Sequence, residues 1–363
     1  MKKTDAIQSF SRLGRFLQQF AANTFDAKAS EESDTQLSAL NRAHASSFEA
    51  CIREEHIHNP WFTDEAVRLA LSGIAKMLRA EVLEKWLKAY TWPDRQGKGL
   101  NIGLVLAGNI PLVGFHDLLC VLITGNRALV KTSGKDDRLI RRIAGILSDI
   151  NPAVSNRICF IEDRLTACDA VIATGSNNSA RYFEYYFRNM PHIIRKNRNS
   201  VAVLSGTETD EELELLGHDI FDYFGLGCRN VTKLYIPIDY ELKNLLGVLD
   251  RFVGLAHHHK YANNVDYHRA LYLMNQDQIL DNGVLLLKED RAIASPPGVV
   301  FYERYTEIEK VKKVLKSRAE EIQCCISLHP AVEGGLKPGD SQVPMPWDYA
   351  DGIDTMNFLS RLA

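Results

Sequence analysis

One cysteine stands where the chain could expose a nucleophile. Cys228, in 224-FGLGCRNVTKLYIP-237, follows Gly225 and Gly227, precedes Arg229, and leads into an apolar run. Glycines allow a sharp turn that can expose a side chain together with a backbone N–H. A neighbouring cation such as Arg229 favours the thiolate form. This pattern by itself suits a nucleophile and a structural thiol equally well.

The other cysteines look different, because most of them stand in apolar runs such as 118-LLCVLI-123. That setting predicts core packing. They are Cys51, Cys120, Cys159, Cys168, Cys324 and Cys325. The odd total of seven, the wide spacing and the lack of a signal-peptide pattern predict reduced thiols and a cytoplasmic protein.

A second polar group follows a short apolar run. Asn109, in 107-AGNIPL-112, comes after the strand-like 101–108 and two residues before a proline. An asparagine amide at such a strand end can donate hydrogen bonds to an oxyanion. The same residue could equally cap the helix that follows.

Two further strand ends carry polar residues. Lys131 ends the run 127-RALVK-131, and Ser133 opens the next loop, so they could hold a nucleotide ribose or phosphate or simply be solvated. Thr174, Gly175 and Ser176 join a strand to a helix, where backbone N–H groups could meet a pyrophosphate. Taken alone, each pattern is weak evidence.

The elements that would position these residues alternate along the chain. Residues 1 to about 90 have helical periodicity, including an amphipathic segment at 1–16. Short apolar runs then alternate with helical segments up to 200–205, which predicts a doubly wound parallel sheet. In such sheets ligands bind at the carboxyl ends of the strands.

The length of 363 residues allows two domains. We expect a helical N-terminal region plus an NAD(P)-binding α/β domain over 1–205, a catalytic cysteine domain over 206–330, and a tail over 331–363 that packs back on the body. The net charge of −3 does not favour nucleic acid as a partner. No apolar run is long enough to predict a membrane span.

Several common chemistries lack their motifs. There is no G-x-G-x-x-G, no G-x-x-x-x-G-K-[ST] and no G-x-S-x-G. The histidines of 257-HHHK-260 have no carboxylate or cysteine at ligand spacing. We therefore predict no metal site.

The order of these motifs resembles the aldehyde dehydrogenase superfamily, and more closely the LuxC-type acyl-CoA reductases. The stretches that carry the resemblance are 103-GLVLAGNIPLVGFHDLL-119, 127-RALVKTSGKD-136, 171-VIATGSNNSA-180, 226-LGCRNVTKLYIP-237 and 339-GDSQVPMPWDYADG-352. The resemblance covers roughly residue 90 to the end. It implies an aldehyde-dehydrogenase-like α/β fold with two doubly wound domains, one for the cofactor and one for catalysis.

The resemblance also implies roles for individual residues. Cys228 matches the nucleophile, and Asn109 matches the residue that stabilises the oxyanion with the Cys228 N–H. Lys131 matches the lysine at the adenosine ribose, with Ser133 beside it. Gly175 and Ser176, which follow Thr174, match the pair under the pyrophosphate.

One departure from the superfamily concerns the final step. Hydrolytic aldehyde dehydrogenases carry a glutamate that activates water, and Ile194 occupies the corresponding position here. Without that carboxylate the resemblance implies exchange with a thiol, because a thiol needs less help than water. The expected reaction is reduction of an acyl thioester, fatty acyl-CoA or an acyl-carrier thioester, to an aldehyde.

The resemblance favours NADPH, with NADH as the other choice, and Lys135 or Arg138 could contact a 2′-phosphate beside Lys131 and Ser133. It also suggests a homo-oligomer and an acyl-protein synthetase or transferase partner. The turn-rich 92-WPDRQGKG-99 is where an oligomerisation hairpin would lie, although it is short. Two alternatives stay open. One is an acyl-phosphate reductase of the same fold, for which Arg229 and Lys233 would supply cations, and the other is a non-catalytic subunit.

Overall fold

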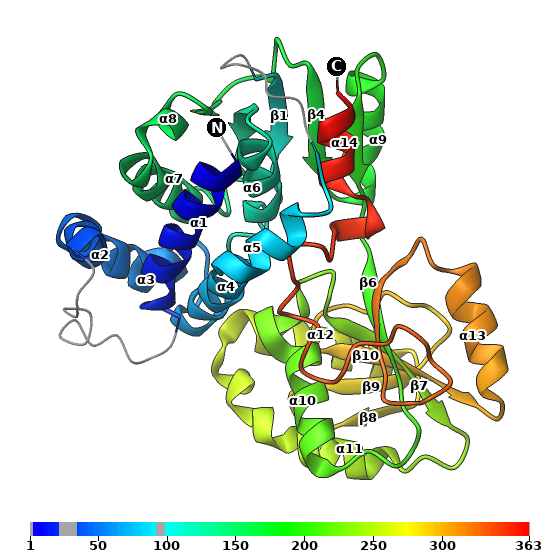
Figure 1. Ribbon diagram of the computed structural model, residues 1–363. Coiled ribbons are helices and arrows are strands. Elements are labelled where there is room, and N and C mark those ends of the chain that lie inside the picture. Colours follow the sequence, from blue (N-terminus) through cyan, green and yellow to red (C-terminus); the bar gives the residue numbers. More distant parts are fainter. Residues whose placement is uncertain (1–2, 22–34, 92–98, 363) are drawn as a thin grey trace. The chain divides into compact units, whose positions relative to one another are not determined.

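The computed structural model describes residues 3–21, 35–91 and 99–362, so the turn at 92–98 lies outside the described residues. The chain forms two compact units. The first comprises Met1–Lys196 together with Pro344–Ala363, and the second comprises Asn197–Val343. Figure 1 shows the elements of both.

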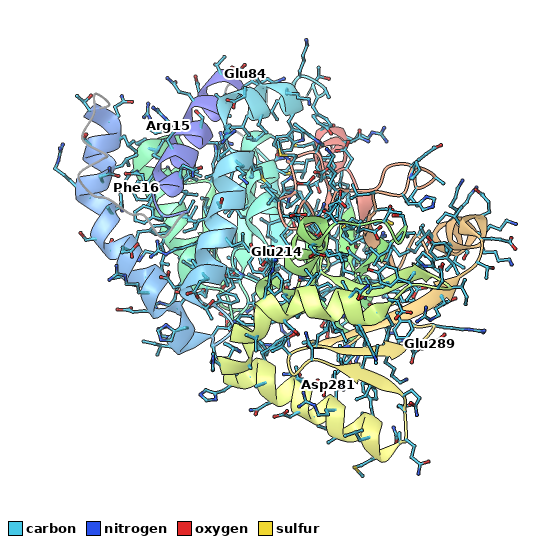
Figure 2. The ribbon with its side chains drawn as sticks, turned by 90° about the horizontal axis from the view of Figure 1, so that it is seen from below. Arg15, Phe16, Glu84, Glu214, Asp281 and Glu289 are labelled. Atoms are coloured by element: carbon cyan, nitrogen blue, oxygen red, sulfur yellow. The ribbon has the colours of Figure 1, made fainter. Side chains whose placement is uncertain are left out.

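The first unit begins with helices. They are α1 (Lys3–Gln18), α2 (Thr35–Leu40), a π-helical turn (Asn41–Ala45), α3 (Ser46–His58), α4 (Asp64–Met77) and α5 (Ala80–Leu87). The predicted amphipathic N-terminal helix is confirmed, because α1 buries Phe10, Leu13 and Phe16 completely. Phe16, labelled in Figure 2, lies 5.8 Å from Phe48 of α3 between ring centroids, so that α1 and α3 share one aromatic core.

The first sheet has five strands. They are β1 (Asn101–Val105), β2 (Arg127–Lys131), β3 (Ile158–Phe160), β4 (Ala170–Thr174) and β5 (His192–Arg195). Their order is β3-β2-β1-β4-β5, and all pairs are parallel. The connecting helices are α6 (Phe115–Ile123), α7 (Arg138–Ile150), α8 (Pro152–Ser155) and α9 (Asn177–Phe187). The strands are short and apolar because both faces of a parallel sheet are covered.

The second sheet has six strands in the order β11-β6-β7-β10-β9-β8, in which only the β8–β9 pair is antiparallel. The strands are β6 (Asn199–Val203), β7 (Val231–Pro237), β8 (Ile279–Asp281), β9 (Leu286–Glu289), β10 (Val299–Tyr305) and β11 (Ile322–Ile326). The helices are α10 (Asp210–Phe221), α11 (Leu242–Leu249), α12 (His259–Met274) and α13 (Ile308–Ser317), with 3₁₀ turns at Asp222–Gly225 and Asp250–His257.

The division into units differs at one strand from the domain limits expected from the sequence. Strand β6, which the sequence analysis assigns to the first domain, pairs with β7 and β11 in the second sheet. The tail, which we expect to pack back on the body, belongs to the second unit up to Val343, and from Pro344 on, with a 3₁₀ turn (Ala350–Gly352) and α14 (Thr355–Arg361), to the first unit. There Tyr349 accepts a 2.8 Å hydrogen bond from the Trp86 indole, which ties the tail to α5.

None of the helices that the structure describes combines the length and the apolar character that crossing a bilayer requires.

Candidate active site

Cys228 follows a corner with unusual backbone geometry. Tyr223 and Phe224 have φ angles of 53° and 59°, and Gly225 follows at 74°. The left-handed region costs a non-glycine residue about 1–2 kcal/mol. Such strain persists only where the surroundings over-determine the conformation, and it is often found at functional sites.

Asn230 is the residue that holds this corner. It is completely buried. Its Nδ2 donates to the carbonyl oxygens of Asp222 at 2.8 Å, Asp219 at 3.1 Å and Ile220 at 3.3 Å. Its Oδ1 accepts the N–H of Gly227 at 2.8 Å. The side chain therefore replaces the missing helical partners at the end of α10 and fixes the residues on both sides of the turn.

Cys228 itself is partly exposed and lies three residues before β7. Its carbonyl oxygen accepts a 3.0 Å hydrogen bond from Ser200 of β6. The Ser200 hydroxyl also lies 2.9 Å from the sulfur of Cys324 in β11. The cysteine is thus held by the adjacent strand as well as by the corner.

The C-terminal stretch that contributes to the family resemblance contacts the same corner. Arg229 donates through Nε to the Ser341 carbonyl oxygen at 2.5 Å. Asp219, buried in α10, accepts the N–H groups of Gly339 at 2.7 Å and Ser341 at 3.0 Å. Burial raises the pKa of Asp219, and these hydrogen bonds oppose the rise. Residues 339–341 therefore contact the residues on both sides of the corner before Cys228, namely Asp219 and Arg229.

The remaining cysteines include several that resist ionisation. All seven cysteines lie in the described residues, and none is in a disulfide. Burial raises the pKa of Cys51 to about 11 and that of Cys325 to about 12. It also raises the pKa values of Cys120 and Cys168. These four thiols are poor nucleophiles because only the thiolate reacts.

The other predicted site residues all lie in the first unit, at one edge of its sheet. Asn109 follows β1, Lys131 ends β2, and Thr174 ends β4. The chain runs from the central β1 to β2 and β3, and then crosses to β4 on the other side. Ligands of open α/β sheets bind outside the carboxyl ends of the strands at such a change of direction.

Asn109 is exposed on a loop that packs tightly against the next one. A Cβ atom on Gly108 would lie 2.6 Å from the Ser133 hydroxyl oxygen, so only glycine fits there. The loop after β1 and the loop after β2 therefore touch. Lys131 donates through Nζ to the carbonyl oxygens of Glu162 and Asp163, which follow β3.

Ser176 caps α9. It accepts the N–H of Ser179 at 3.2 Å, so the first turn of α9 starts at the carboxyl edge of β4. A Cβ atom on Gly175 would lie 2.9 Å from atoms of both Ser179 and Phe183. The corner therefore needs glycine. The Gly175 N–H donates to the Arg195 carbonyl oxygen of β5 at 3.3 Å, and the N-terminal end of α9 that follows carries the positive end of the helix dipole.

These features fit a dinucleotide. A helix N-terminus behind a bare glycine suits a pyrophosphate. A lysine and a serine at the end of β2, which β1 separates from β4, suit a ribose or a phosphate. Arg138 is less suited to a 2′-phosphate than the sequence suggests, because it pairs with Glu54 at 3.0 Å.

Other polar groups have ordinary structural partners. Lys233 is completely buried, contacts Glu303 at 3.2 Å, and burial lowers its pKa. His258 caps α12 by accepting the N–H of Tyr261 and stacks on Phe224 at 4.2 Å. Within residues 3–21, 35–91 and 99–362, no group of three His, Cys, Asp or Glu side chains could hold a metal ion.

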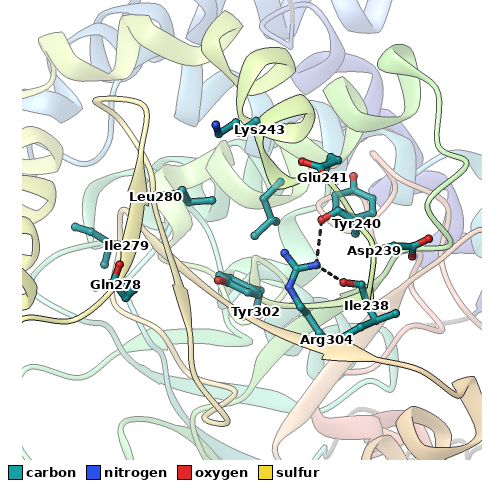
Figure 3. A pocket seen from close by; sticks show the side chains of 11 residues that line it. Ile238, Asp239, Tyr240, Glu241, Lys243, Gln278, Ile279, Leu280, Tyr302 and Arg304 are labelled. Carbon is teal, nitrogen blue, oxygen red and sulfur yellow. Dashed lines mark hydrogen bonds between the residues drawn. The ribbon is translucent and has the colours of Figure 1, made fainter.

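The pocket in Figure 3 lies at the other end of β7. It has a volume of about 360 Å³ and is lined by residues after β7 and by Tyr302 and Arg304 of β10. Arg304 donates to the carbonyl oxygens of Ile238 at 2.8 Å and Tyr240 at 3.1 Å, which fastens the β7–α11 loop. Cys228 precedes β7, so a strand of seven residues, roughly 20 Å long, separates it from this pocket.

Sequence reasoning missed Asn230, Ser200 and Asp219 as supports of the cysteine. Asn230 was visible beside Cys228, but its partners lie 8 to 11 residues earlier at the end of a helix. Ser200 and Asp219 gave no local signal, because their contacts join strands and segments far apart in the sequence.

Solved structures show that the fold is aldehyde-dehydrogenase-like, as the sequence predicts. The chain resembles aldehyde dehydrogenase 21 from Physcomitrella patens, solved with the reaction product succinate, with a TM-score of 0.65 and 11% identity over 100% of this chain and 89% of that one. It also resembles a Mycobacterium tuberculosis aldehyde dehydrogenase solved with NAD⁺, with a TM-score of 0.56 and 12% identity over 93% and 76% of the two chains.

The chain belongs to the acyl-CoA reductase (LuxC) family, whose model matches residues 8–243. Among curated proteins it is 25% identical over 266 residues to a long-chain acyl-protein thioester reductase from Aliivibrio fischeri, covering 63% of this chain and 54% of the relative. The corresponding protein from Vibrio harveyi is 22% identical over 262 residues, covering 64% and 54%. The chain therefore spans about half the length of these relatives.

Proposed function

We propose that the protein reduces an acyl thioester, a fatty acyl-CoA or an acyl-carrier thioester, to an aldehyde through a covalent thioester on Cys228. The observation that carries the proposal is a partly exposed cysteine at a backbone corner that a buried asparagine holds in place. Membership of the acyl-CoA reductase family supports it. The names of the curated relatives support a long acyl chain.

In the proposed reaction the Cys228 thiolate attacks the thioester carbonyl carbon, and a new C–S bond forms. The oxyanion accepts hydrogen bonds from the Asn109 amide and the Cys228 N–H. When the oxyanion collapses, the carbon–sulfur bond to the CoA or carrier thiol of the substrate breaks. That thiol leaves as a thiolate and takes up a proton. The acyl group remains on Cys228.

When bound, NADPH or NADH would supply the hydride for reduction of this thioester. The role of Cys228 would then be to leave as the thiolate, so that the carbon–sulfur bond breaks and the aldehyde is free. Lys131 and Ser133 would hold the ribose or its 2′-phosphate. Gly175, Ser176 and the preceding Thr174 would hold the pyrophosphate at the start of α9. Ile194 at the position of the hydrolytic glutamate supports release to hydride rather than to water.

The buried state of Lys233 weakens the acyl-phosphate alternative. That reading needs cations near Cys228 for the phosphate, and Lys233 is enclosed beside Glu303. Arg229 already donates to Ser341. We also propose a homo-oligomer and an acyl-protein synthetase or transferase as partner, on the family resemblance alone.

A turnover assay tests the proposal. The protein is incubated with NADPH and either a long-chain acyl-CoA or an acyl phosphate, and the loss of NADPH absorbance and the formation of aldehyde are followed. Turnover of the acyl-CoA, lost in Cys228→Ala, is the expected result. Turnover of acyl phosphate alone, or equal turnover by Cys228→Ala, would contradict the proposal.

A further inference from the structure

A buried carboxyl group lies between the two loops that carry the proposed residues of the first unit. Asp136, in the loop between β2 and α7, is only 4% exposed. Its Oδ2 accepts the N–H of Leu112 at 2.7 Å. Its Oδ1 is also buried and has no hydrogen-bond partner in the part of the chain that the structure describes. A carboxyl group in this state costs free energy, so its presence indicates a specific structural or functional role.

Leu112 needs a holding contact because of its backbone. It lies in the left-handed region with φ at 58°, where a branched side chain is disfavoured. Pro111 before it has no N–H. The bond to Asp136 is therefore a fixed point at the end of the short segment 109–112 that begins with Asn109.

A second contact fixes the other end of the same segment. Gly108 packs so close to the next loop that an added Cβ would lie 2.6 Å from the Ser133 hydroxyl oxygen and 3.2 Å from the Asp136 nitrogen. The Asp136 N–H in turn donates to the Ser133 carbonyl oxygen at 3.0 Å. Asn109 thus lies between two residues that are both anchored on the loop of residues 133–136.

The surroundings of Asp136 keep this loop in one conformation. Asn59, at the end of α3, donates to the carbonyl oxygen of Lys135 at 3.2 Å. Burial, with smaller contributions from Glu55 and Asp137, raises the pKa of Asp136 to about 7. Either protonation state leaves one oxygen able to accept from Leu112.

We propose that Asp136 is a positioning residue, whose carboxyl group holds the segment of Asn109 in register with the loop that carries Lys131 and Ser133. The inference rests on the proposed function, because it concerns the oxyanion-binding role of Asn109. Because Asp136 is buried, this role requires no contact with substrate or cofactor. It acts through Leu112, and it makes the oxyanion donor and the cofactor loop of the first unit keep one relative geometry.

The first experiment compares two variants of Asp136. Asp136→Asn keeps an oxygen that accepts from Leu112, and Asp136→Ala removes it. The rate of Cys228 acylation is measured in a single turnover with acyl-CoA and no cofactor. We expect Asp136→Asn to stay within about threefold of the wild type and Asp136→Ala to be slowed at least tenfold, which is part of the roughly 100-fold or larger effect of removing an oxyanion donor.

A double-mutant comparison separates positioning from general damage. If Asp136 acts through Asn109, then Asn109→Ala should slow acylation much less in the Asp136→Ala background than in the wild type. Ile143→Val, a change at a completely buried position in the middle of α7, is the control for lost stability. Additive effects of the two substitutions, or equal slowing by the control, would overturn the proposal.

Amide exchange gives a readout that does not depend on activity. The Leu112 amide should be protected in the wild type and in Asp136→Asn, and unprotected in Asp136→Ala. If the wild-type protein is never acylated, the proposed function is wrong, but exchange at Leu112 still tests whether Asp136 holds this segment. Unchanged protection of the Leu112 amide in a folded Asp136→Ala protein would overturn the positioning role of Asp136.

Discussion

Replacing Asn230 by alanine should destabilise the corner before Cys228, because it removes the hydrogen bonds that hold this corner. The side chain makes one bond as acceptor, from Gly227, and its amide group donates to the carbonyls of Asp219, Ile220 and Asp222. The amide has two hydrogens, so these contacts amount to about three hydrogen bonds. At about 1 kcal/mol net for each, with an added cost for the buried N–H of Gly227, the loss is about 3–5 kcal/mol.

The effect should be local as well as large. Without Asn230, the left-handed conformations of Tyr223 and Phe224 lose the contact that over-determines them. We expect Asn230→Ala to lower the free energy of opening for amides in β7 and to slow acylation of Cys228. Asn230→Asp keeps the acceptor but turns a carboxylate toward three carbonyl oxygens, so it should destabilise the corner at pH 7 and less at pH 4.

Native-state hydrogen exchange is the appropriate assay, because a chain with two units does not guarantee two-state unfolding. The free energies of opening are compared for strands of the second sheet and, as an internal control, for strands of the first. A change below about 1 kcal/mol in β7, with acylation at the wild-type rate, would refute the role given to Asn230.

Three further substitutions test other parts of the account. Asn109→Ala should slow acylation of Cys228 about 100-fold or more, judging by other oxyanion donors, and an unchanged rate constant would remove it from the site. Gly175→Ala places a Cβ 2.9 Å from atoms of Ser179 and Phe183, so the start of α9 must shift, at a cost of about 1 kcal/mol or more. If the cofactor binds there, its affinity should fall about fivefold or more, as measured by titration with NADPH. Wild-type affinity in this variant would argue against a cofactor at α9. Asp136 has its pKa raised from 3.8 to about 7, so the native state binds the proton more tightly and wild-type stability should fall as pH rises from about 4 to 7. Asp136→Asn cannot titrate, so its free energy of unfolding relative to the wild type should rise by at most about 4 kcal/mol between pH 4 and pH 7 in denaturant titrations. A difference that does not depend on pH would contradict the raised pKa of Asp136.

Much of the first sheet could be predicted from the sequence. Short apolar runs locate β1, β2 and β4, because a strand buried on both faces must be apolar throughout. In the first sheet β5 was missed, and in the second β8, since each contains only two apolar residues and so gives no apolar run. The pairing of β6 with β7 could not be foreseen, because an apolar run identifies a strand without telling which sheet receives it.

The candidate site was predictable where it depends on local chain features. Cys228 after two glycines and Asn109 two residues before a proline have signatures within a few residues. The supports of Cys228 do not, because Ser200 reaches it from the adjacent strand. Asp136 stands in the polar stretch 133-SGKDD-137, which gives no sign that one of its two aspartates is buried.

The most direct test of the central claim is the site of acylation. The protein is incubated with a long-chain acyl-CoA without cofactor and digested, and the cysteine peptides are examined by mass spectrometry. The account predicts one acyl group, carried by the peptide of Cys228, absent in Cys228→Ala and discharged as aldehyde when NADPH is added. An acyl group on another cysteine that turns over with NADPH, or turnover without any adduct at Cys228, would contradict it.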